Sequence, residues 1–405
     1  MKFIPKLEKL VLEASKSLDK NLFTKDFKIV SVKIPAKNVQ TFLYSLPPDS
    51  VLVVPKLKPI VPYLLAQEQK SENPVSMETK TEKVFRRILL ARDELGEFKT
   101  ELGEDILNKF EAILEEHSIT LKYENWSTEE ILHAILPPET DIPSSYEAAG
   151  HLIRLNLPED VSPHAAALIG QVLIDKTPGI RTVVRKTANI SNQFRVLPLT
   201  LVAGEDNFIV SLRESECTFR FDYSQVYWNS RLQHEHGRLV DLFKPGQVIV
   251  DMFAGVGPFS IPAAKKHCLV YANDLNPQSF HWLNDNAKLN KINSTNLKTF
   301  NLDAKDFIQS LSLDQADHVI MNLPAMATEF LNVFPSKGFE DSTLFHCYLF
   351  VRPSQDPIQL VQNSATQQLI NPKAFNVRNV APNKDMYRVS FQLGSASAKR
   401  SKTIQ

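Results

Sequence analysis

The run Val248-Ile-Val-Asp-Met-Phe-Ala-Gly-Val-Gly-Pro-Phe-Ser260 joins an apolar segment to a turn with two glycines. The apolar segment is typical of a strand that ends at Asp251, and a helix is expected after Gly255 and Gly257. In a doubly wound sheet, ligands bind beside such turns, at the carboxyl ends of the strands. Glycine lets the backbone approach a ligand without an intervening Cβ. The motif therefore predicts a small-molecule site around Asp251 and Gly255.

Two more acids, Asp274 and Asp303, end the next two predicted strands. The turn lacks the three-glycine spacing that faces a pyrophosphate, which favours a cofactor without phosphate. S-adenosylmethionine fits this set, because Asp251 can reach its charged amino-acid end and Asp274 its ribose hydroxyls. Asp303 can accept from the adenine amino group, while Leu275 and Ala304 would add backbone and apolar contacts to the base. The alternative for each acid is a helix N-cap.

The fourth predicted strand ends in Asn322-Leu323-Pro324. This run resembles the Asn-Pro-Pro type of motif in methyltransferases that modify nitrogen. In that motif, a side-chain oxygen and a following carbonyl accept hydrogen bonds from N–H groups of the target. Leu323 stands where the motif has a proline, and a strand end capped by Asn and Pro is the alternative interpretation.

The segment Val226–Arg238 precedes the first of these strands and is rich in polar residues. On a helix that starts near Ser230, Arg231 and Glu235 would share a face, which by itself indicates a surface ion pair. His234 and His236 would point to different sides, so no zinc site is expected. The three cysteines lie too far apart for a metal site or a disulfide framework, and no metal is predicted.

Several runs resemble the tRNA guanine-37 N1-methyltransferase family of eukaryotes and archaea. They are Tyr227-Trp-Asn-Ser-Arg-Leu-Gln-His-Glu-His236, Ser145-Tyr-Glu-Ala-Ala-Gly-His-Leu-Ile-Arg-Leu-Asn-Leu157, the segment from Asn189 to Glu205, and Val380-Ala-Pro-Asn-Lys-Asp-Met-Tyr-Arg-Val-Ser-Phe391. With the cofactor and Asn-Leu-Pro motifs they cover roughly residues 123–393, whereas the first hundred residues match only loosely. The resemblance implies methyl transfer from S-adenosylmethionine to N1 of guanosine 37, and whether inosine 37 is accepted stays open.

The resemblance also assigns roles to individual residues. Guanine N1 carries a proton, so its methylation needs a base, and negative charge develops at O6. Glu235 is implied as the general base and Arg195 as the cation at O6, where such a donor speeds a reaction about a hundred- to thousandfold. Asn322 would hold the base edge near the methyl group. The remaining implied contacts are His236 to the cofactor, and Tyr227, Arg231 and Pro324 to the RNA.

A basic cluster indicates where RNA phosphates could bind. Arg181, Arg185, Lys186 and Arg195 lie in a stretch without acids. A solvated strand face is the alternative. The resemblance implies that the N-terminal domain checks the tRNA body while the following domains grip the anticodon loop, and that the target guanine leaves its stack.

The pattern of elements predicts four regions. Residues 1–135 read as an N-terminal α+β region, with strands at Phe27–Ile34 and Ser50–Val54, a loop at Gln67–Lys83 and helices at Val84–His117 and Glu129–Leu136. Residues 136–225 read as a small α+β RNA-binding domain whose strands include Gly150–Leu157 and Phe194–Val202. Residues 226–393 alternate strand and helix, which predicts a Rossmann-like class I methyltransferase domain, doubly wound and mostly parallel with an antiparallel last strand. Residues 394–405 read as a disordered basic tail.

Composition excludes a uniformly basic RNA-binding protein, because 46 basic residues balance 46 acidic ones. No apolar run suits a membrane span, so no membrane association is expected, and a monomer is expected. Cytoplasm, nucleus and mitochondrial matrix are all candidate locations, since residues 1–28 are Lys-rich but carry acids that presequences avoid.

Two other functions fit parts of the pattern. An aminocarboxypropyl transferase of wybutosine synthesis would use the same cofactor on tRNA, and a catalytically silent tRNA-binding protein would keep the fold. Arg195, Glu235 and Asn322 together favour the methyltransferase.

Overall fold

The computed structural model describes residues 5–10, 18–63, 84–143, 145–158, 160–187, 194, 196–312, 316–336, 339 and 342–394. The chain forms two compact units, one of Met1–Ser144 with Pro158–Pro178 and the other of Ser145–Leu157 with Gly179–Gln405. The predicted boundary near residue 225 lies inside the second unit. The predicted loop at Gln67–Lys83 and the tail after Gly394 fall outside the described residues.

The first unit contains a four-stranded antiparallel sheet in the order β2-β3-β1-β4. Its strands are β1 (Lys25–Pro35), β2 (Ile60–Pro62), β3 (Phe85–Leu89) and β4 (Ile113–Leu121). Short helices flank it: η1 (Lys20–Phe23), η2 (Ala36–Asn38), α1 (Val39–Leu43), α2 (Leu95–Leu102) and α3 (Glu104–Lys109). Val30, Val32, Ile88 and Phe98 belong to its buried core.

Two predictions for this unit are wrong. The segment Val84–His117 is not one helix but the series β3, α2, α3 and the start of β4, because pairing with the central strand β1 overrides local helix propensity. Gly103 adopts φ +84° between α2 and α3, which a continuing helix cannot accommodate. At Ser50–Val54, only a single bridge from Val51 to Leu90 forms.

Helices complete the first unit: η4 (Tyr123–Asn125), α4 (Thr128–Ile135) and α5 (Pro163–Lys176). A capping box begins α4, since the Ser127 side chain accepts from the Glu130 N–H while the Glu130 side chain accepts from the Ser127 N–H. Ser162 caps α5 with a single hydrogen bond, in which its hydroxyl accepts from the Ala165 N–H.

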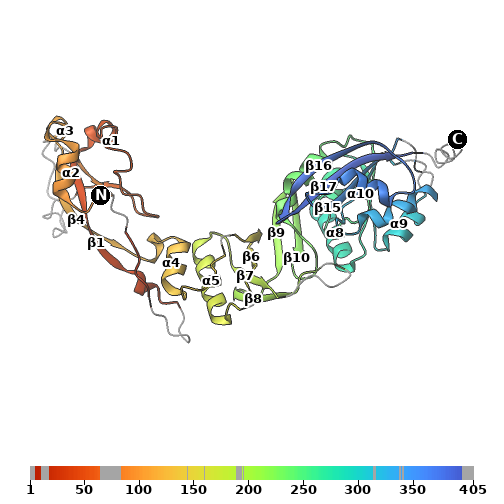
Figure 1. Ribbon diagram of the computed structural model, residues 1–405, viewed down its shortest axis with the longest axis horizontal. Helices are drawn as coiled ribbons and strands as arrows, with labels where there is room; N and C mark the ends of the chain where they lie inside the picture. Colours follow the sequence, from red (N-terminus) through yellow and green to blue (C-terminus); the bar gives the residue numbers. More distant parts are fainter. Residues whose placement is uncertain are drawn as a thin grey trace. The chain divides into compact units, whose positions relative to one another are not determined.

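The second unit is built on a seven-stranded sheet with the order β13-β12-β11-β14-β15-β17-β16. Figure 1 shows its strands β15, β17 and β16 side by side. The strands are β11 (Val248–Asp251), β12 (Leu269–Asn273), β13 (Leu297–Phe300), β14 (His318–Met321), β15 (Leu344–Val351), β16 (Leu369–Ala381) and β17 (Lys384–Leu393). The first five are parallel, and β17 runs antiparallel to both β15 and β16, so the predicted antiparallel last strand is confirmed. The predicted Rossmann-like fold is likewise confirmed.

Both faces of this sheet are buried. Ile249 and Val250 are neighbours on β11 but belong to different apolar cores, as expected for alternating side chains under helices on two sides. The helices are η5 (Ser230–Leu232), α6 (Gln233–Val240), α7 (Ser260–Lys265), α8 (Pro277–Leu289), α9 (Ala304–Ser310), η6 (Ala327–Ser336) and α10 (Pro357–Ser364).

Two smaller sheets belong to the same unit. One has the order β5-β6-β7-β8, formed by Glu147–Ala149, Leu152–Leu155, Thr182–Lys186 and Leu199–Gly204. The other is the hairpin β9 (Ile209–Glu214) and β10 (Cys217–Asp222). Residues of these sheets, including Leu152, Val184 and Phe219, share one continuous core with Ile249 and Val270 of the large sheet. Strand β8 is shorter than the predicted Phe194–Val202.

Asparagines of α8 hold the hairpin in place. The side chain of Asn286 accepts from the Arg220 N–H at 2.8 Å, and Asn290 both accepts from and donates to the backbone of Thr218. These side chains satisfy edge groups of β10 that would otherwise be unpaired. Among the described residues, no helix has the length and apolar character needed to cross a membrane.

Candidate functional site

The turn after β11 carries the first predicted acid. Asp251 is fully buried, and its Oδ2 accepts from the Ser260 hydroxyl at 2.6 Å. Its Oδ1 has no hydrogen-bond partner among the described residues. Burial raises the pKa of Asp251 to about 7, against the lowering effect of the Ser260 hydroxyl and the Phe253 N–H. A buried acceptor oxygen without a partner indicates a ligand that donates to it.

Gly257 in the same turn has no room for a side chain. Its φ is +100°, and a Cβ would meet Ile261 Cγ1 at 2.6 Å and Leu283 Cδ1 at 2.7 Å. Gly255 also has a positive φ of +55°, but nothing lies within 4 Å of its Cβ position. The first glycine of the turn thus leaves open space, and the second allows tight packing against α7 and α8.

Asp274 links the ends of β11 and β12. Its Oδ2 accepts from the Gly255 N–H at 2.8 Å, and its Oδ1 accepts from the Asn276 N–H at 2.9 Å. Burial raises its pKa to about 6, opposed by these two N–H groups and the Ser279 hydroxyl. Asp274, which is predicted to bind the ribose of the cofactor, therefore also holds the glycine turn in place.

Asp303 is a helix N-cap, which is the alternative role considered for each of the three acids. It caps α9 by accepting from the Lys305 N–H at 2.8 Å. Asp303 as a residue is exposed. Ala304 beside it is buried, and Leu275 is half-buried. Sequence reasoning missed Asn273, whose side chain donates to the Leu302 carbonyl and accepts from the Leu302 N–H, tying the ends of β12 and β13 together.

Asn322 follows β14 directly and presents a second unpaired acceptor. Its Oδ1 is buried and has no hydrogen-bond partner among the described residues. The following carbonyls are engaged, since Leu323 O accepts from Met326 and Ala327 and Pro324 O accepts from the Phe350 N–H at 3.3 Å. Of the two acceptors expected in an Asn-Pro-Pro type motif, the side-chain oxygen is the one available.

Glu235 lies on α6 with an exposed fraction of only 4%. Its Oε1 accepts from the Tyr348 hydroxyl at 2.9 Å and lies 3.0 Å from Arg388 Nη1. Its Oε2 contacts both Nε and Nη2 of Arg238. The predicted neighbour Arg231 is exposed and precedes α6, so the ion pair of Glu235 forms with Arg238 instead.

Strand register brings Glu235 to the same edge as Asn322. Met321 is opposite Cys347 in the parallel pair β14–β15, so Asn322 and Tyr348 are the next residues along. The Tyr348 hydroxyl then reaches Glu235, and the Tyr348 ring packs 6.1 Å from that of Phe259 in the glycine turn. Glu235, the predicted general base, precedes the large sheet in the chain. It therefore lies at the edge of the sheet that carries Asn322 and Asp251.

His236 is also buried, and its Nδ1 lies 2.5 Å from Oε1 of the buried Glu214 on β9. Its ring packs edge-on against Phe259 at 4.8 Å. The contact with Phe259 places it beside the glycine turn. Glu214 could not be found from sequence spacing, because it lies on a separate hairpin.

The predicted RNA-binding residues are spread over the second unit. Tyr227 and Arg231 are exposed, and Pro324 is half-buried. Arg181 pairs with Glu205 at 3.1 Å, while Arg185 and Lys186 are half-buried on β7. Arg195 lies outside the described residues.

These residues fit S-adenosylmethionine. A charged amino group and hydroxyls could donate to the free Oδ1 of Asp251 and to Asp274, both at the carboxyl ends of the strands. Within the part of the chain that the structure describes, no group of three or more His, Cys, Asp or Glu could hold a metal.

Comparisons with known proteins place this geometry in context. Residues 210–372 match the TRM5/TYW2 methyltransferase domain, and residues 128–207 match the TYW2 N-terminal domain. The chain is 43% identical to the tRNA (guanine(37)-N(1))-methyltransferase of Mus musculus. The matched region covers 76% of this chain and 65% of the mouse protein. It is 38% identical to the enzyme of that name from Phytophthora infestans, over 94% of this chain and 93% of the relative. Among solved structures, Trm5b from Pyrococcus abyssi is 27% identical with a TM-score of 0.65, covering 90% of this chain and 99% of that one.

Proposed function

The chain belongs to the tRNA (guanine(37)-N(1))-methyltransferase family, and on that premise we propose how its residues methylate N1 of guanosine 37 in tRNA. The observation that carries the proposal is the meeting of Glu235, Asn322 and Asp251 at one edge of the sheet. A base, an acceptor for the nucleobase edge and a cofactor acceptor are the groups that the reaction requires.

S-adenosylmethionine supplies an electrophilic methyl group when it is bound. Asp251 and Asp274 would hold its amino and hydroxyl groups, and Gly255 leaves open space beside them. The position of His236 against Phe259 supports a contact at the edge of this site. Asp303 and Ala304 would border the adenine at the end of β13.

Glu235 removes the N1 proton in this proposal. Two hydrogen bonds already use the oxygens of Glu235, since Tyr348 donates to Oε1 and Arg238 Nε donates to Oε2. Arg388 Nη1 and Arg238 Nη2 add ion pairs, so two guanidinium groups lie against the carboxylate. In this proposal one arginine moves aside when guanine N1–H approaches. Arg238 is the best candidate, because its side chain is 36% exposed while that of Arg388 is 3% exposed.

Two more residues act on the guanine. The unpaired Oδ1 of Asn322 accepts from an N–H on the base edge, which orients N1 towards the methyl group. Arg195 stabilises the charge that develops at O6, a role that rests on the family resemblance and on guanidinium chemistry. Tyr227, Arg231 and Pro324 would line the path of the RNA, with Arg181, Arg185 and Lys186 near its phosphates.

The test is incubation of the enzyme with unmodified tRNA transcripts carrying G, A or I at position 37 and a labelled methyl donor. We expect N1-methylguanosine at position 37 of the G transcript and no product with A. Mass spectrometry of the nucleoside gives the size of the added group, and an aminocarboxypropyl adduct would replace the proposal with its nearest rival. Tight tRNA binding without any transfer would support a silent binding protein.

A monomeric state and distribution among cytoplasm, nucleus and mitochondrial matrix remain predictions from the sequence. Sedimentation with and without tRNA tests the first, and imaging of the tagged full-length chain tests the second.

A further inference from the structure

A cross-strand pair of buried side chains holds one oxygen of Glu235. Tyr348 on β15 lies directly opposite Arg388 on β17 in the antiparallel pairing of these two strands. Opposite residues present their side chains on the same face of a sheet, close to each other. Both side chains reach Oε1 of Glu235, the Tyr348 hydroxyl at 2.9 Å and Arg388 Nη1 at 3.0 Å. Two neighbouring strands therefore converge on a single carboxylate oxygen.

The Tyr348 hydroxyl gives that contact its direction. Its O–H donates to Oε1, whereas Arg388 Nη1 has no hydrogen-bond partner among the described residues and contributes charge. Tyr348 is completely buried, and burial together with the negative charge of Glu235 raises the pKa of its hydroxyl well above the usual value. The hydroxyl therefore stays protonated and remains a donor to Oε1.

The other oxygen of Glu235 has a different environment. Oε2 contacts Arg238, whose side chain is 36% exposed. The residues that hold Oε1 belong to the interior of the sheet, so displacing them would require β15 and β17 to separate. Arg238 can turn towards solvent without such a rearrangement. Of the two oxygens, Oε2 is thus the one that an incoming N–H group can reach.

We propose that Tyr348 is a positioning residue that holds Oε1 of Glu235, so that Oε2 receives the N1 proton of the guanine. The inference rests on the proposed function and adds to it the accepting atom and the residue that selects it. N1 loses its proton to Oε2 and forms a bond to the methyl carbon, whose bond to sulfur breaks. Oε1 keeps its hydrogen bond from Tyr348 throughout. The Tyr348 ring also packs 6.1 Å from that of Phe259, which keeps the base aligned with the glycine turn.

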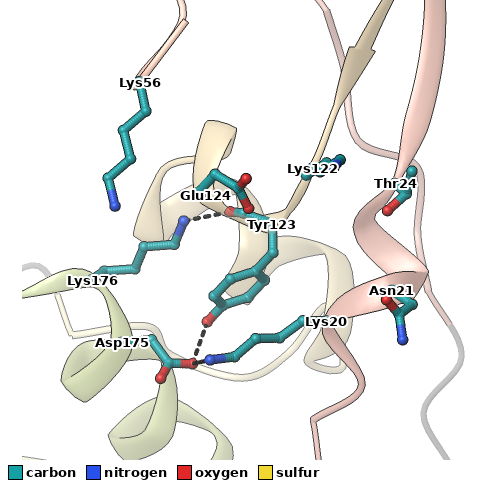
Figure 2. A pocket seen from close by; sticks show the side chains of 9 residues that line it. All are labelled: Lys20, Asn21, Thr24, Lys56, Lys122, Tyr123, Glu124, Asp175 and Lys176. Carbon is teal, nitrogen blue, oxygen red and sulfur yellow. Dashed lines mark hydrogen bonds and ion pairs between the residues drawn. The ribbon is translucent and has the colours of Figure 1, made fainter. Parts of the chain in front are cut away.

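A second tyrosine–carboxylate contact provides a matched control. In the first unit the Tyr123 hydroxyl donates to Asp175 Oδ2 at 3.0 Å, and Lys20 pairs with the same oxygen at 2.9 Å (Figure 2). As at Tyr348, a buried phenol and a cation share one carboxylate oxygen, but here they border a cavity of about 320 Å³. Tyr123→Phe therefore removes the same type of hydrogen bond from a carboxylate that the proposed reaction does not use.

The first test compares Tyr348→Phe with Tyr123→Phe in single-turnover methyl transfer to tRNA, with cofactor and tRNA both saturating. We expect Tyr348→Phe to slow the reaction by about ten- to a hundredfold, which is what one hydrogen bond to a charged group is worth. Tyr123→Phe should leave the rate unchanged. Calorimetry should give nearly wild-type affinity for S-adenosylmethionine in both variants, which also shows that they are folded, so the loss lies in kcat and not in KM. Equal rates for the two variants would overturn the proposal.

The second test asks whether the hydroxyl acts through Glu235. In the Glu235→Gln background, adding Tyr348→Phe should change the single-turnover rate by less than about twofold, because the group that the hydroxyl positions is already lost. A further loss of about tenfold would mean that Tyr348 supports the site in a general way, and the positioning role would be wrong.

The third test is the pH profile of the single-turnover rate at saturating substrates. The acid limb of Tyr348→Phe should lie at higher pH than that of the wild type, since a donor to the ionised carboxylate is gone. The other charged groups packed around this carboxylate stay in place: Arg238 from α6, Arg388 from β17 and, next along α6, His236 with its partner Glu214 from β9. An unshifted acid limb would contradict the proposal. A wild-type enzyme that failed to methylate guanosine 37 would instead refute the proposed function, which separates the two outcomes.

Discussion

Arg388 Nη1 lies 3.0 Å from Glu235 Oε1, and the two side chains are 3% and 4% exposed. The contact joins helix α6 to strand β17, which is more than a hundred residues later in the chain. The guanidinium also lies 4.7 Å from the centre of the Phe375 ring. A buried ion pair thus holds the proposed base against the antiparallel end of the sheet.

Replacement of Arg388 by Met should destabilise the fold, because it leaves the Glu235 carboxylate buried with one charge partner fewer. Losing one member of a buried pair typically costs about 3–5 kcal/mol, and the remaining contact with Arg238 places the expected loss near the lower end. Urea denaturation measures it. Arg352→Met is the control, since Arg352 is exposed, and a similar loss there would contradict the interpretation.

Glu235→Gln should slow single-turnover methyl transfer by about a hundred- to ten-thousandfold, the contribution of a positioned base. Binding of S-adenosylmethionine should change little, as measured by calorimetry. Glu329→Gln, an exposed substitution of the same kind, should have no effect. A near-normal rate for Glu235→Gln would show that another group removes the proton.

Arg238→Gln should retain methyl transfer, in contrast to Glu235→Gln. The reason is that Arg238 occupies acceptor positions of Glu235 that the guanine needs, and a weaker donor is displaced more easily. Single-turnover rates with saturating tRNA give the comparison. If Arg238→Gln lost as much activity as Glu235→Gln, Arg238 would belong to the catalytic arrangement and the displacement model would be wrong.

The affinity for S-adenosylmethionine should depend on the ionisation of Asp251. Its pKa is raised to about 7, and the ionised form is the one that binds a positively charged amino group. Affinity should therefore be full above pH 7 and fall as the pH decreases through that value, by up to about tenfold per unit. Calorimetry between pH 5.5 and about 8.5 measures the profile. Asp251→Asn should bind weakly and lose the decrease around pH 7, keeping only a decrease near pH 6 from Asp274, whose pKa is raised to about 6. An unchanged profile in that variant would assign the titration elsewhere.

The two glycines of the cofactor turn should respond differently to alanine. Gly255→Ala meets no atom within 4 Å and costs only the left-handed backbone, about 1–2 kcal/mol. Gly257→Ala adds close contacts with Ile261 and Leu283 and should cost about 1–3 kcal/mol more. Thermal unfolding of both variants tests which one loses more stability. Equal losses of stability would mean that α7 and α8 shift easily to make room for the added methyl group.

The sequence predicted most of the second unit because its signals are local. Apolar runs that end in Asp251, Asp274 and Asn322 identify strands whose carboxyl ends share one edge. The first unit was harder, since β3 and β4 are defined by pairing with β1 rather than by their own composition.

The surroundings of the base could not be predicted in the same way. Tyr348 lies within an apolar strand and is typical of a core residue, yet its hydroxyl binds Glu235. Arg388 and Glu214 come from β17 and β9, and only the three-dimensional fold brings them to α6. Spacing along the chain contains no information about such contacts.

The continuous core of the second unit has a consequence for how this enzyme can be divided. Leu152, Val184 and Phe219 pack with Ile249 and Val270, so a fragment starting at residue 226 would leave a broad apolar surface in water. Amide hydrogens of β7 and β10 should then exchange together with those of β11, as one cooperative block. The cofactor-binding sheet should therefore fold as one unit with β7 and β8, the strands on either side of the segment that contains Arg195.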